Sequence, residues 1–253
     1  ILFARTIAAL QLQVNIYHCE PVPGMRNRRP MTKTPSSSAT PALAERPLVL
    51  VTGASRGLGF AIASALGETG WHVLAVARTV GGLEELDDRI QKAGGVATLA
   101  PMDITDPKAM EHLAQSIAAR WGGLDLWVHA AIHAAPLAPA GHVDGRDFAK
   151  SVATNLRATA TLIPLMEPLL RARRGKAVFL DDPRGGEKFF ASYGATKAGQ
   201  IALAKSWQAE CAATGPHVII LEPSPTATAT RARFYPGEDR SARADIHEEA
   251  QRL

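Results

Sequence analysis

The chain has 253 residues, of which 46% are hydrophobic and 21% are charged, and this composition is that of an ordinary globular protein. A core of this size excludes any need for a disulfide or a structural metal to hold the fold. The formal net charge is +4, but the basic residues form no stripe with interleaved aromatic residues, which argues against a nucleic-acid-binding function.

Residues 1–46 differ in composition from the rest of the chain. Their initial apolar run, ILFARTIAALQLQV, is too short and too interrupted to span a bilayer, although its arginine and its lack of early acids slightly resemble a transit peptide. The segment that follows is rich in Pro, Ser, Thr and Arg, which predicts disorder. We prefer an alternative to targeting, in which translation starts at Met31 and the preceding residues are an extension or a sequence artefact.

The cysteines Cys19 and Cys211 lie far apart and fit no metal-ligand spacing. They are therefore expected to be free thiols in a reducing compartment, which predicts a cytoplasmic protein.

From Pro47 onward, apolar runs alternate with amphipathic segments. The expected strands are residues 47–52, 72–77, 96–100, 124–130, 176–180 and 217–222. The expected helices are residues 57–69, 83–93, 106–122, 147–173 and 191–213, with Asp106 as an N-cap, Pro107 in a first turn, and Pro164 and Pro168 as bends. The alternation predicts a single α/β domain over 47–253, in which one doubly wound, Rossmann-type parallel sheet carries helices on both faces.

The first expected strand continues directly into TGASRGLG, which places Gly53, Gly57 and Gly59 between a strand and a helix. Glycines allow the backbone to turn tightly and to approach a pyrophosphate, and a helix N-terminus offers free N–H groups to the anion. A glycine triplet in this position inside a βαβ unit predicts a dinucleotide site.

The glycine motif TGxxxGxG, together with the motif YxxxK at Tyr193-Gly194-Ala195-Thr196-Lys197, resembles the short-chain dehydrogenase/reductase family. The resemblance covers the chain from Pro47 to about Thr230. It implies an oxidoreductase that interconverts a small-molecule carbonyl and an alcohol by hydride transfer from NAD(P)(H), with no membrane partner, as a homodimer or homotetramer.

The second expected strand ends at Arg78 and Thr79, where an NAD site would place a carboxylate on the ribose hydroxyls. An arginine attracts a 2′-phosphate instead, and Arg56 in the glycine loop could lie on the same side. NADP(H) is therefore the preferred cofactor and NAD(H) the alternative, while Arg78 as a solvated helix-cap residue is the competing interpretation. The cofactor-binding residues that the resemblance implies are Gly53, Ser55, Arg56, Gly57, Leu58, Gly59, Arg78, Thr79, Asp103, His129, Ala130, Ala131, Tyr193, Lys197, Pro223 and Thr228.

Tyr193 and Lys197 are four residues apart on a predicted helix, so their side chains share one face. A nearby ammonium lowers the pKa of a tyrosine and fits it for acid/base work at neutral pH. The resemblance gives Lys197 a second role on the nicotinamide ribose and makes Asn155 the anchor of a water in a proton relay; Asn155 as a packing amide remains the alternative. The resemblance also implies that Asp103 contacts the adenine; the alternative is that Asp103 is a simple turn residue. It further implies that Thr228 contacts the nicotinamide amide, in a segment where Ser224 stands at a position that is usually glycine.

Two segments depart from the family pattern. His129-Ala130-Ala131-Ile132 stands where the family reads Asn-Asn-Ala-Gly. His129 can keep the contact of the asparagine with the neighbouring strand, while Ile132 is expected to displace the backbone beside the ribose. His129 and His133 have no third ligand at a sensible spacing, so no metal site is expected.

The second departure concerns the substrate side. Asp182 aligns with the family serine that binds the substrate oxygen, and an ionised carboxylate there would oppose a developing alkoxide. Asp182 could instead donate as a protonated acid, bind a cationic or hydroxylated substrate, or cap its own loop; Ser192 is a poor substitute. Residues 223–253 are expected to form a substrate lid, and the family's seventh strand is missing before the end of the sequence. A nucleotide-binding pseudoenzyme or regulatory protein is therefore the alternative to a working enzyme.

Overall fold

A computed structural model of the chain describes residues 46–253. The expectations for residues 1–45, including the disordered extension, the start at Met31 and the free thiol of Cys19, lie outside the described residues. Cys211 is a buried free thiol, as expected.

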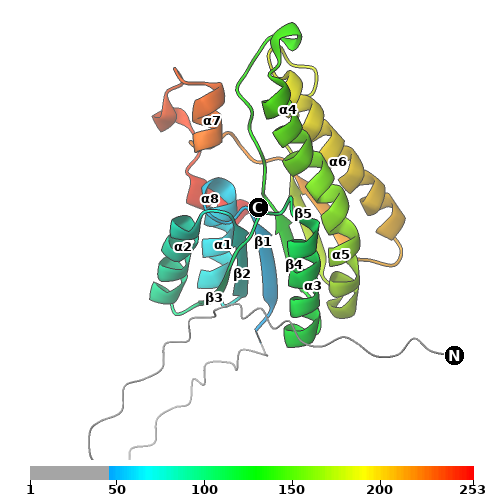
Figure 1. Ribbon diagram of the computed structural model, residues 1–253. Helices are drawn as coiled ribbons and strands as arrows, with labels where there is room; N and C mark the ends of the chain where they lie inside the picture. The colour runs from blue at the N-terminus through cyan, green and yellow to red at the C-terminus, as the bar shows by residue number, and fades with distance from the viewer. Residues whose placement is uncertain (1–45) are drawn as a thin grey trace, which may run out of the picture. The chain divides into compact units, whose positions relative to one another are not determined.

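Six parallel strands form one sheet in the order β3-β2-β1-β4-β5-β6 (Figure 1). They are β1 (Leu48–Thr52), β2 (His72–Ala77), β3 (Val96–Pro101), β4 (Leu126–His129), β5 (Lys176–Leu180) and β6 (His217–Leu221). The chain moves outward from β1 to β3 and then returns to the other side of β1, so the strand order reverses between β1 and β4. Such a switch point opens a crevice at the carboxyl ends of the strands, and the expected doubly wound fold is confirmed.

The helices expected over 57–69, 83–93, 106–122 and 191–213 are present, with ends that differ by at most three residues. The α-helices are α1 (Gly57–Glu68), α2 (Val80–Lys92), α3 (Pro107–Trp121), α4 (Gly145–Ser151), α5 (Ala158–Arg173) and α6 (Ala191–Cys211), followed by α7 (Ala229–Phe234) and α8 (Ile246–Arg252). Asp106 caps α3 by accepting hydrogen bonds from the backbone N–H groups of Lys108 and Ala109, as its position predicts. Short 3₁₀ turns lie at Ala140–His142 and Arg240–Ala242.

The long helix expected over 147–173 is not uniformly α-helical. A π-helical turn, η3 (Val152–Arg157), separates α4 from α5, whereas Pro164 and Pro168 lie inside α5. The change in helical geometry therefore comes before the prolines that were expected to cause it. π-helical turns are often found at functional sites, and this one carries Asn155.

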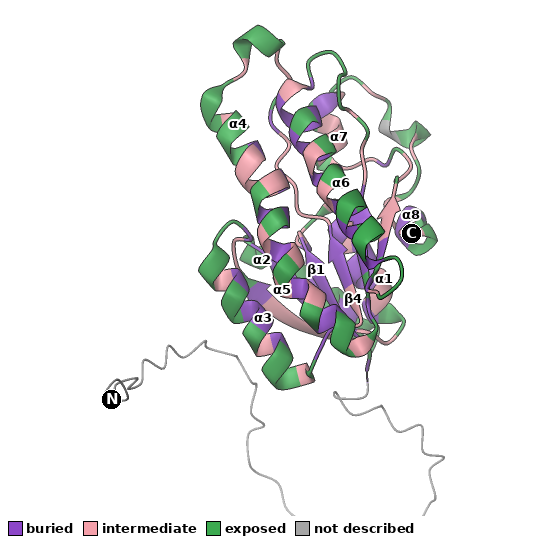
Figure 2. Cartoon of the chain, turned by 90° about the vertical axis from the view of Figure 1, so that its right-hand side faces the viewer, coloured by how far each residue is buried: buried purple, intermediate pink, exposed green. Residues whose placement is uncertain are grey.

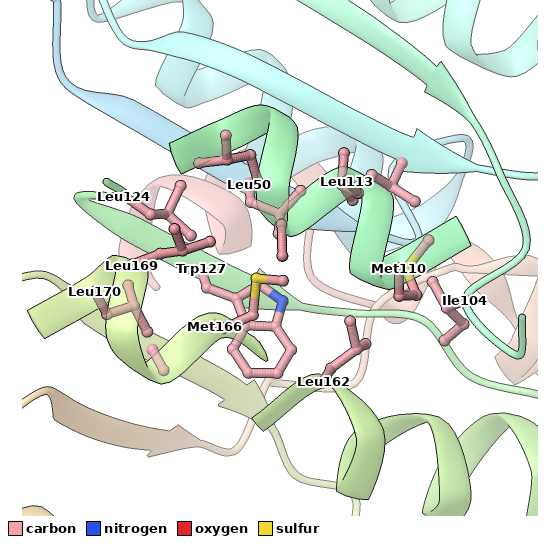
Figure 3. Close-up of a cluster of buried hydrophobic side chains, with 14 of the residues drawn as sticks. Leu50, Ile104, Met110, Leu113, Leu124, Trp127, Leu162, Met166, Leu169 and Leu170 are labelled. Carbon is pink, nitrogen blue, oxygen red and sulfur yellow. The ribbon is translucent and has the colours of Figure 1, made fainter. Parts of the chain in front are cut away.

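Two apolar clusters hold the helices to the sheet, because alternate residues of a strand face opposite sides. Leu48 and Leu50 of β1 pack with α3, α5 and α6, whereas Val49 and Val51 pack with α1, α2 and α8, and Figure 1 shows these two helix layers on either side of the sheet. Every residue of β1 and β2 is buried, and Figure 2 shows β1 among the buried strands inside the molecule. In the first cluster, the fully buried Trp127 lies among leucines and methionines (Figure 3).

His129 joins the central strands to the helix layer. Its Nδ1 lies 2.8 Å from Thr52 Oγ1 on β1, and its Nε2 lies 2.9 Å from Thr159 Oγ1 on α5. Burial, together with the nearby Lys197, lowers the pKa of His129 to about 3, so the ring is neutral and can donate on one side and accept on the other. The expected contact between this position and the neighbouring strand is therefore present.

No helix among residues 46–253 has the length and apolar character needed to cross a bilayer.

Candidate active site

A cleft of about 350 Å³ opens at the carboxyl ends of the strands, beside the β1/β4 switch point. Its wall contains all of the residues predicted to bind cofactor, and Asp182 as well. The loops after each of the six strands contribute to it, so segments far apart in the sequence meet at one edge of the sheet. The predicted site is thus brought together in one place, except for Asn155, which is not part of the wall.

The glycine loop touches the end of β4 directly. Gly53 has a φ of +86°, and a Cβ placed on it would lie 2.6 Å from the backbone nitrogen of Ala131. Gly57 has a φ of +61° and begins α1. The N-cap residue, Arg56, makes no side-chain hydrogen bond to the helix, so the first N–H groups of α1 have no capping side chain and are suited to an anion.

Arg78 and Asp103 lie next to each other in the cleft wall. Arg78 Nη1 is 3.7 Å from Asp103 Oδ2, and the Arg78 side chain is 64% exposed. The other oxygen of Asp103 accepts hydrogen bonds from the backbone N–H and the hydroxyl of Thr105. Asp103 therefore has the contacts of a turn residue and also faces the cleft. Thr79, which follows Arg78, is the N-cap residue of α2.

Tyr193 lies near the start of α6, with only 3% of its surface exposed. Its ring packs against Phe234, with the ring centres 4.9 Å apart, and its hydroxyl donates a hydrogen bond of 3.0 Å to Asp182 Oδ2. Burial raises the pKa of Tyr193 strongly, and the carboxylate of Asp182 raises it further. The expected lowering of this pKa is therefore wrong for the structure, and the phenol is protonated at neutral pH.

Asp182 follows β5 and holds two donors. Its Oδ1 accepts from Nε of Arg184 at 2.9 Å, while its Oδ2 accepts from Tyr193. Arg184 also bonds Glu187 through Nη1. Both donors suit an ionised carboxylate, and Arg184 is a site residue that the sequence did not reveal, although its spacing of two residues from Asp182 could have indicated the pair.

Lys197 is 3% exposed, and its Nζ donates to Oε1 of Gln200 at 2.6 Å. Burial lowers the pKa of Lys197 to about 8, against the opposite effect of Asp181 and Asp182. Gln200 in turn donates through Nε2 to Thr159 Oγ1 at 3.1 Å, which connects the ammonium to the buried His129. Gln200 was missed from the sequence; its spacing of three residues from Lys197 was the available signal.

Asn155 is fully buried in the π-helical turn. Its amide accepts from the backbone N–H of His133 at 2.7 Å and donates to the backbone carbonyl of His133 and to Thr196 Oγ1, each at 3.0 Å. These contacts match the packing-amide interpretation and fix the loop after β4 against α6. The relay role implied by the family resemblance stays a prediction.

The loop after β4 accommodates Ile132 without a left-handed backbone, since the non-glycine residues with positive φ in the described part of the chain are Arg174 and Phe189. Ile132 packs beside Phe190, Tyr193 and Phe234. Between residues 46 and 253, no group of three or more His, Cys, Asp or Glu side chains is arranged to hold a metal ion.

Residues of the C-terminal segment also line the cleft. Pro223 and Thr228 line it, and the Thr228 hydroxyl caps α7 by accepting from the backbone N–H of Arg231. The backbone N–H of Ser224 donates to the buried carboxylate of Glu249 on α8 at 2.7 Å. Ser224, which stands where glycine is usual, is thus hydrogen-bonded through its backbone to α8. Helix α8 in turn packs against α1.

Comparison with known proteins identifies the family to which this site belongs. The chain is 31% identical to the 3-oxoacyl-acyl-carrier-protein reductase of Escherichia coli (strain K12) over 183 residues, which cover 71% of this chain and 73% of that protein. It is 30% identical over 167 residues to the fatty acyl-CoA reductase of Acinetobacter baylyi, where the match covers 64% of this chain but only 57% of the relative.

A solved structure has the same architecture. The short-chain dehydrogenase from Streptomyces avermitilis superposes with a TM-score of 0.70 at 25% identity, covering 82% of each chain. The model of the family described as short chain dehydrogenase matches residues 47–239, which include the glycine loop, Tyr193 and Lys197. The chain therefore belongs to the short chain dehydrogenase family of NAD(P)-binding oxidoreductases.

Proposed function

We propose that the protein is an NADP(H)-dependent reductase that converts a small carbonyl compound to an alcohol, with Tyr193 as the acid/base group. The observation that carries the proposal is the position of Tyr193 and Lys197 in the wall of the same cleft as the glycine loop. Both relatives named above are reductases, which supports the reductive direction.

The residues present fit a nicotinamide dinucleotide. A Cβ at Gly53 would collide with the backbone of Ala131, and the uncapped start of α1 suits a pyrophosphate. When bound, the cofactor supplies the hydride. Arg78 and Arg56, both in the cleft wall, would hold a 2′-phosphate, and Lys197 would hold the nicotinamide ribose.

Tyr193 delivers the proton that reduction requires. Its raised pKa keeps the phenol protonated at neutral pH, so it is ready to donate to the carbonyl oxygen as charge develops there. Opposite charges favour the ionised form, and Arg184 is the cation that lowers the pKa of Tyr193. The phenolate left behind is therefore stabilised by Arg184, together with the ammonium of Lys197 in the same cleft wall. Asn155 positions the loop after β4 and, as proposed from the family, anchors a water of the relay.

The test is turnover of a panel of ketones and aldehydes with NADPH and with NADH, followed by identification of the alcohol product. NADPH-dependent reduction is expected. Tight cofactor binding without turnover on any member of the panel would instead indicate a nucleotide-binding pseudoenzyme, and calorimetry without binding of either cofactor contradicts both functions. The lid at residues 223–253, the cytoplasmic location and the homo-oligomer remain proposals of the same kind.

Arg78→Ala is expected to weaken NADPH binding about tenfold and to leave NADH binding unchanged, because a phosphate contact by arginine contributes about 1.5 kcal/mol or more. Calorimetric titration with each cofactor measures both affinities. Arg120→Ala, at an exposed arginine near the end of α3, is the matched control and is expected to change neither. Tighter binding of NADH than of NADPH by the unaltered protein contradicts the cofactor assignment.

Gln200→Leu is expected to move the alkaline loss of reductase activity to lower pH by about one unit. Gln200 Oε1 is the hydrogen-bond acceptor of the buried ammonium, and its removal disfavours the charged form, so the pKa of Lys197 falls below about 8. The pH dependence of kcat/KM reports this shift. Gln208→Leu, on the same helix but bonded to the Val218 carbonyl, should keep the original pH profile; an unchanged profile in Gln200→Leu contradicts the role.

A further inference from the structure

We propose that the preferred substrate carries a hydroxyl group on the carbon next to its carbonyl, and that this hydroxyl donates to Asp182. The inference rests on the proposed function and names its substrate class. It begins with the two donors of the Asp182 carboxylate: Arg184 Nε on Oδ1 at 2.9 Å and the Tyr193 hydroxyl on Oδ2 at 3.0 Å.

Tyr193 has a single hydroxyl proton and cannot donate to two acceptors at once. When it donates to a substrate carbonyl, Asp182 Oδ2 loses the donor that it has in the free protein. An ionised carboxylate can only accept hydrogen bonds. The Asp182 side chain is 31% exposed in the free protein, but a substrate bound against Tyr193 covers Oδ2 from water, and an acceptor that is covered and left without a partner is costly. The reacting complex therefore needs a new donor at Oδ2.

The substrate is well placed to supply that donor. Two acceptors that bond one hydroxyl each lie about 3 Å from its oxygen, so the substrate carbonyl oxygen comes within a few ångströms of Asp182 Oδ2. A hydroxyl on the adjacent carbon of the substrate lies within reach of the same carboxylate oxygen. Arg184 holds the other oxygen of Asp182 and also bonds Glu187, so the carboxylate is fixed in this orientation.

A simple ketone fits this site poorly for an electrostatic reason. Negative charge grows on its oxygen during reduction, and Asp182 places a second negative charge close by. A neighbouring hydroxyl forms a charge-assisted hydrogen bond with Asp182 and separates the two oxygens. Phe234 and Tyr235, which line the cleft beside Tyr193, give the rest of the substrate an apolar, aromatic surface.

Three matched ketones test the proposal: hydroxymethyl phenyl ketone, methoxymethyl phenyl ketone and methyl phenyl ketone. The hydroxyl and methoxy compounds have similar electronic effects on the carbonyl, but only the first can donate. With NADPH, kcat/KM is expected to be at least about tenfold higher for the hydroxymethyl compound than for either of the others. In Asp182→Ser, whose hydroxyl can itself donate to the substrate oxygen, the preference should fall below about threefold.

Equal kcat/KM for the hydroxymethyl and methoxymethyl compounds in the unaltered protein overturns the inference and leaves the reductase function standing. The same holds if Asp182→Ser keeps the full preference, or if other carbonyl compounds are reduced but none of these three. Absence of turnover on every carbonyl tested removes both the function and the inference. NADPH affinity and the melting temperature of Asp182→Ser establish that the variant is folded. The comparison of the three ketones in the unaltered protein does not depend on this variant.

Discussion

Tyr193→Phe is expected to lower kcat/KM for carbonyl reduction by about 10³-fold, within the range that general acid catalysis contributes. The phenol lies in the cleft wall and is held protonated at neutral pH, because burial and Asp182 raise its pKa. Phenylalanine keeps the ring that packs against Phe190 and Phe234 but removes the proton donor. Steady-state kinetics with NADPH measure the loss.

The same variant separates catalysis from binding. NADPH affinity is expected to stay within about threefold, since the ring and the glycine loop are unaltered; this bound corresponds to less than about 1 kcal/mol. Tyr235→Phe is the matched control, because Tyr235 also lines the cleft and has no proposed part in proton transfer. Turnover by Tyr193→Phe at the rate of the unaltered protein would show that another group supplies the proton.

Features of the fold that depend on local patterns were predictable from the sequence. The ranges of β2 and β5 agree with expectation at every residue, because continuous apolar runs bounded by polar or glycine residues mark buried strands. The glycine loop and the Tyr193–Lys197 pair were also predictable, since each needs only a short spacing. Their convergence on one cleft follows from parallel topology, which brings the carboxyl ends of the strands to one edge.

Features that depend on tertiary contacts were not predictable. The π-helical turn around Asn155 has no local sequence pattern, and its amide finds its partners on the loop after β4 and on α6. The pKa of Tyr193 depends on Asp182, which lies eleven residues earlier and reaches it through the turn after β5. The spacing of Tyr193 and Lys197 suggested a direct electrostatic pair, but Gln200 takes the hydrogen bond of the ammonium.

Gly53→Ala is expected to destabilise the protein by about 2–5 kcal/mol, the combined cost of a left-handed alanine and of overpacking. Gly53 has a φ of +86°, and the Cβ of an alanine there would lie 2.6 to 2.8 Å from three backbone atoms of Ala130 and Ala131. Backbone atoms at the end of β4 cannot rotate away as a side chain can, so the loops after β1 and β4 must separate. Denaturant unfolding without cofactor measures the free energy of unfolding.

Gly57→Ala isolates the part of that cost that comes from backbone conformation. Gly57 also has a positive φ, of +61°, but the nearest atom to a Cβ there is a Thr228 methyl carbon at 4.0 Å. Only the strain of about 1–2 kcal/mol is expected, so the difference between the two variants measures the contact between the loops. If both alanines cost the same, the approach of Gly53 to Ala131 is not a constraint on the fold. If Gly53→Ala costs more and also weakens NADPH binding, the loop contact shapes the cofactor site.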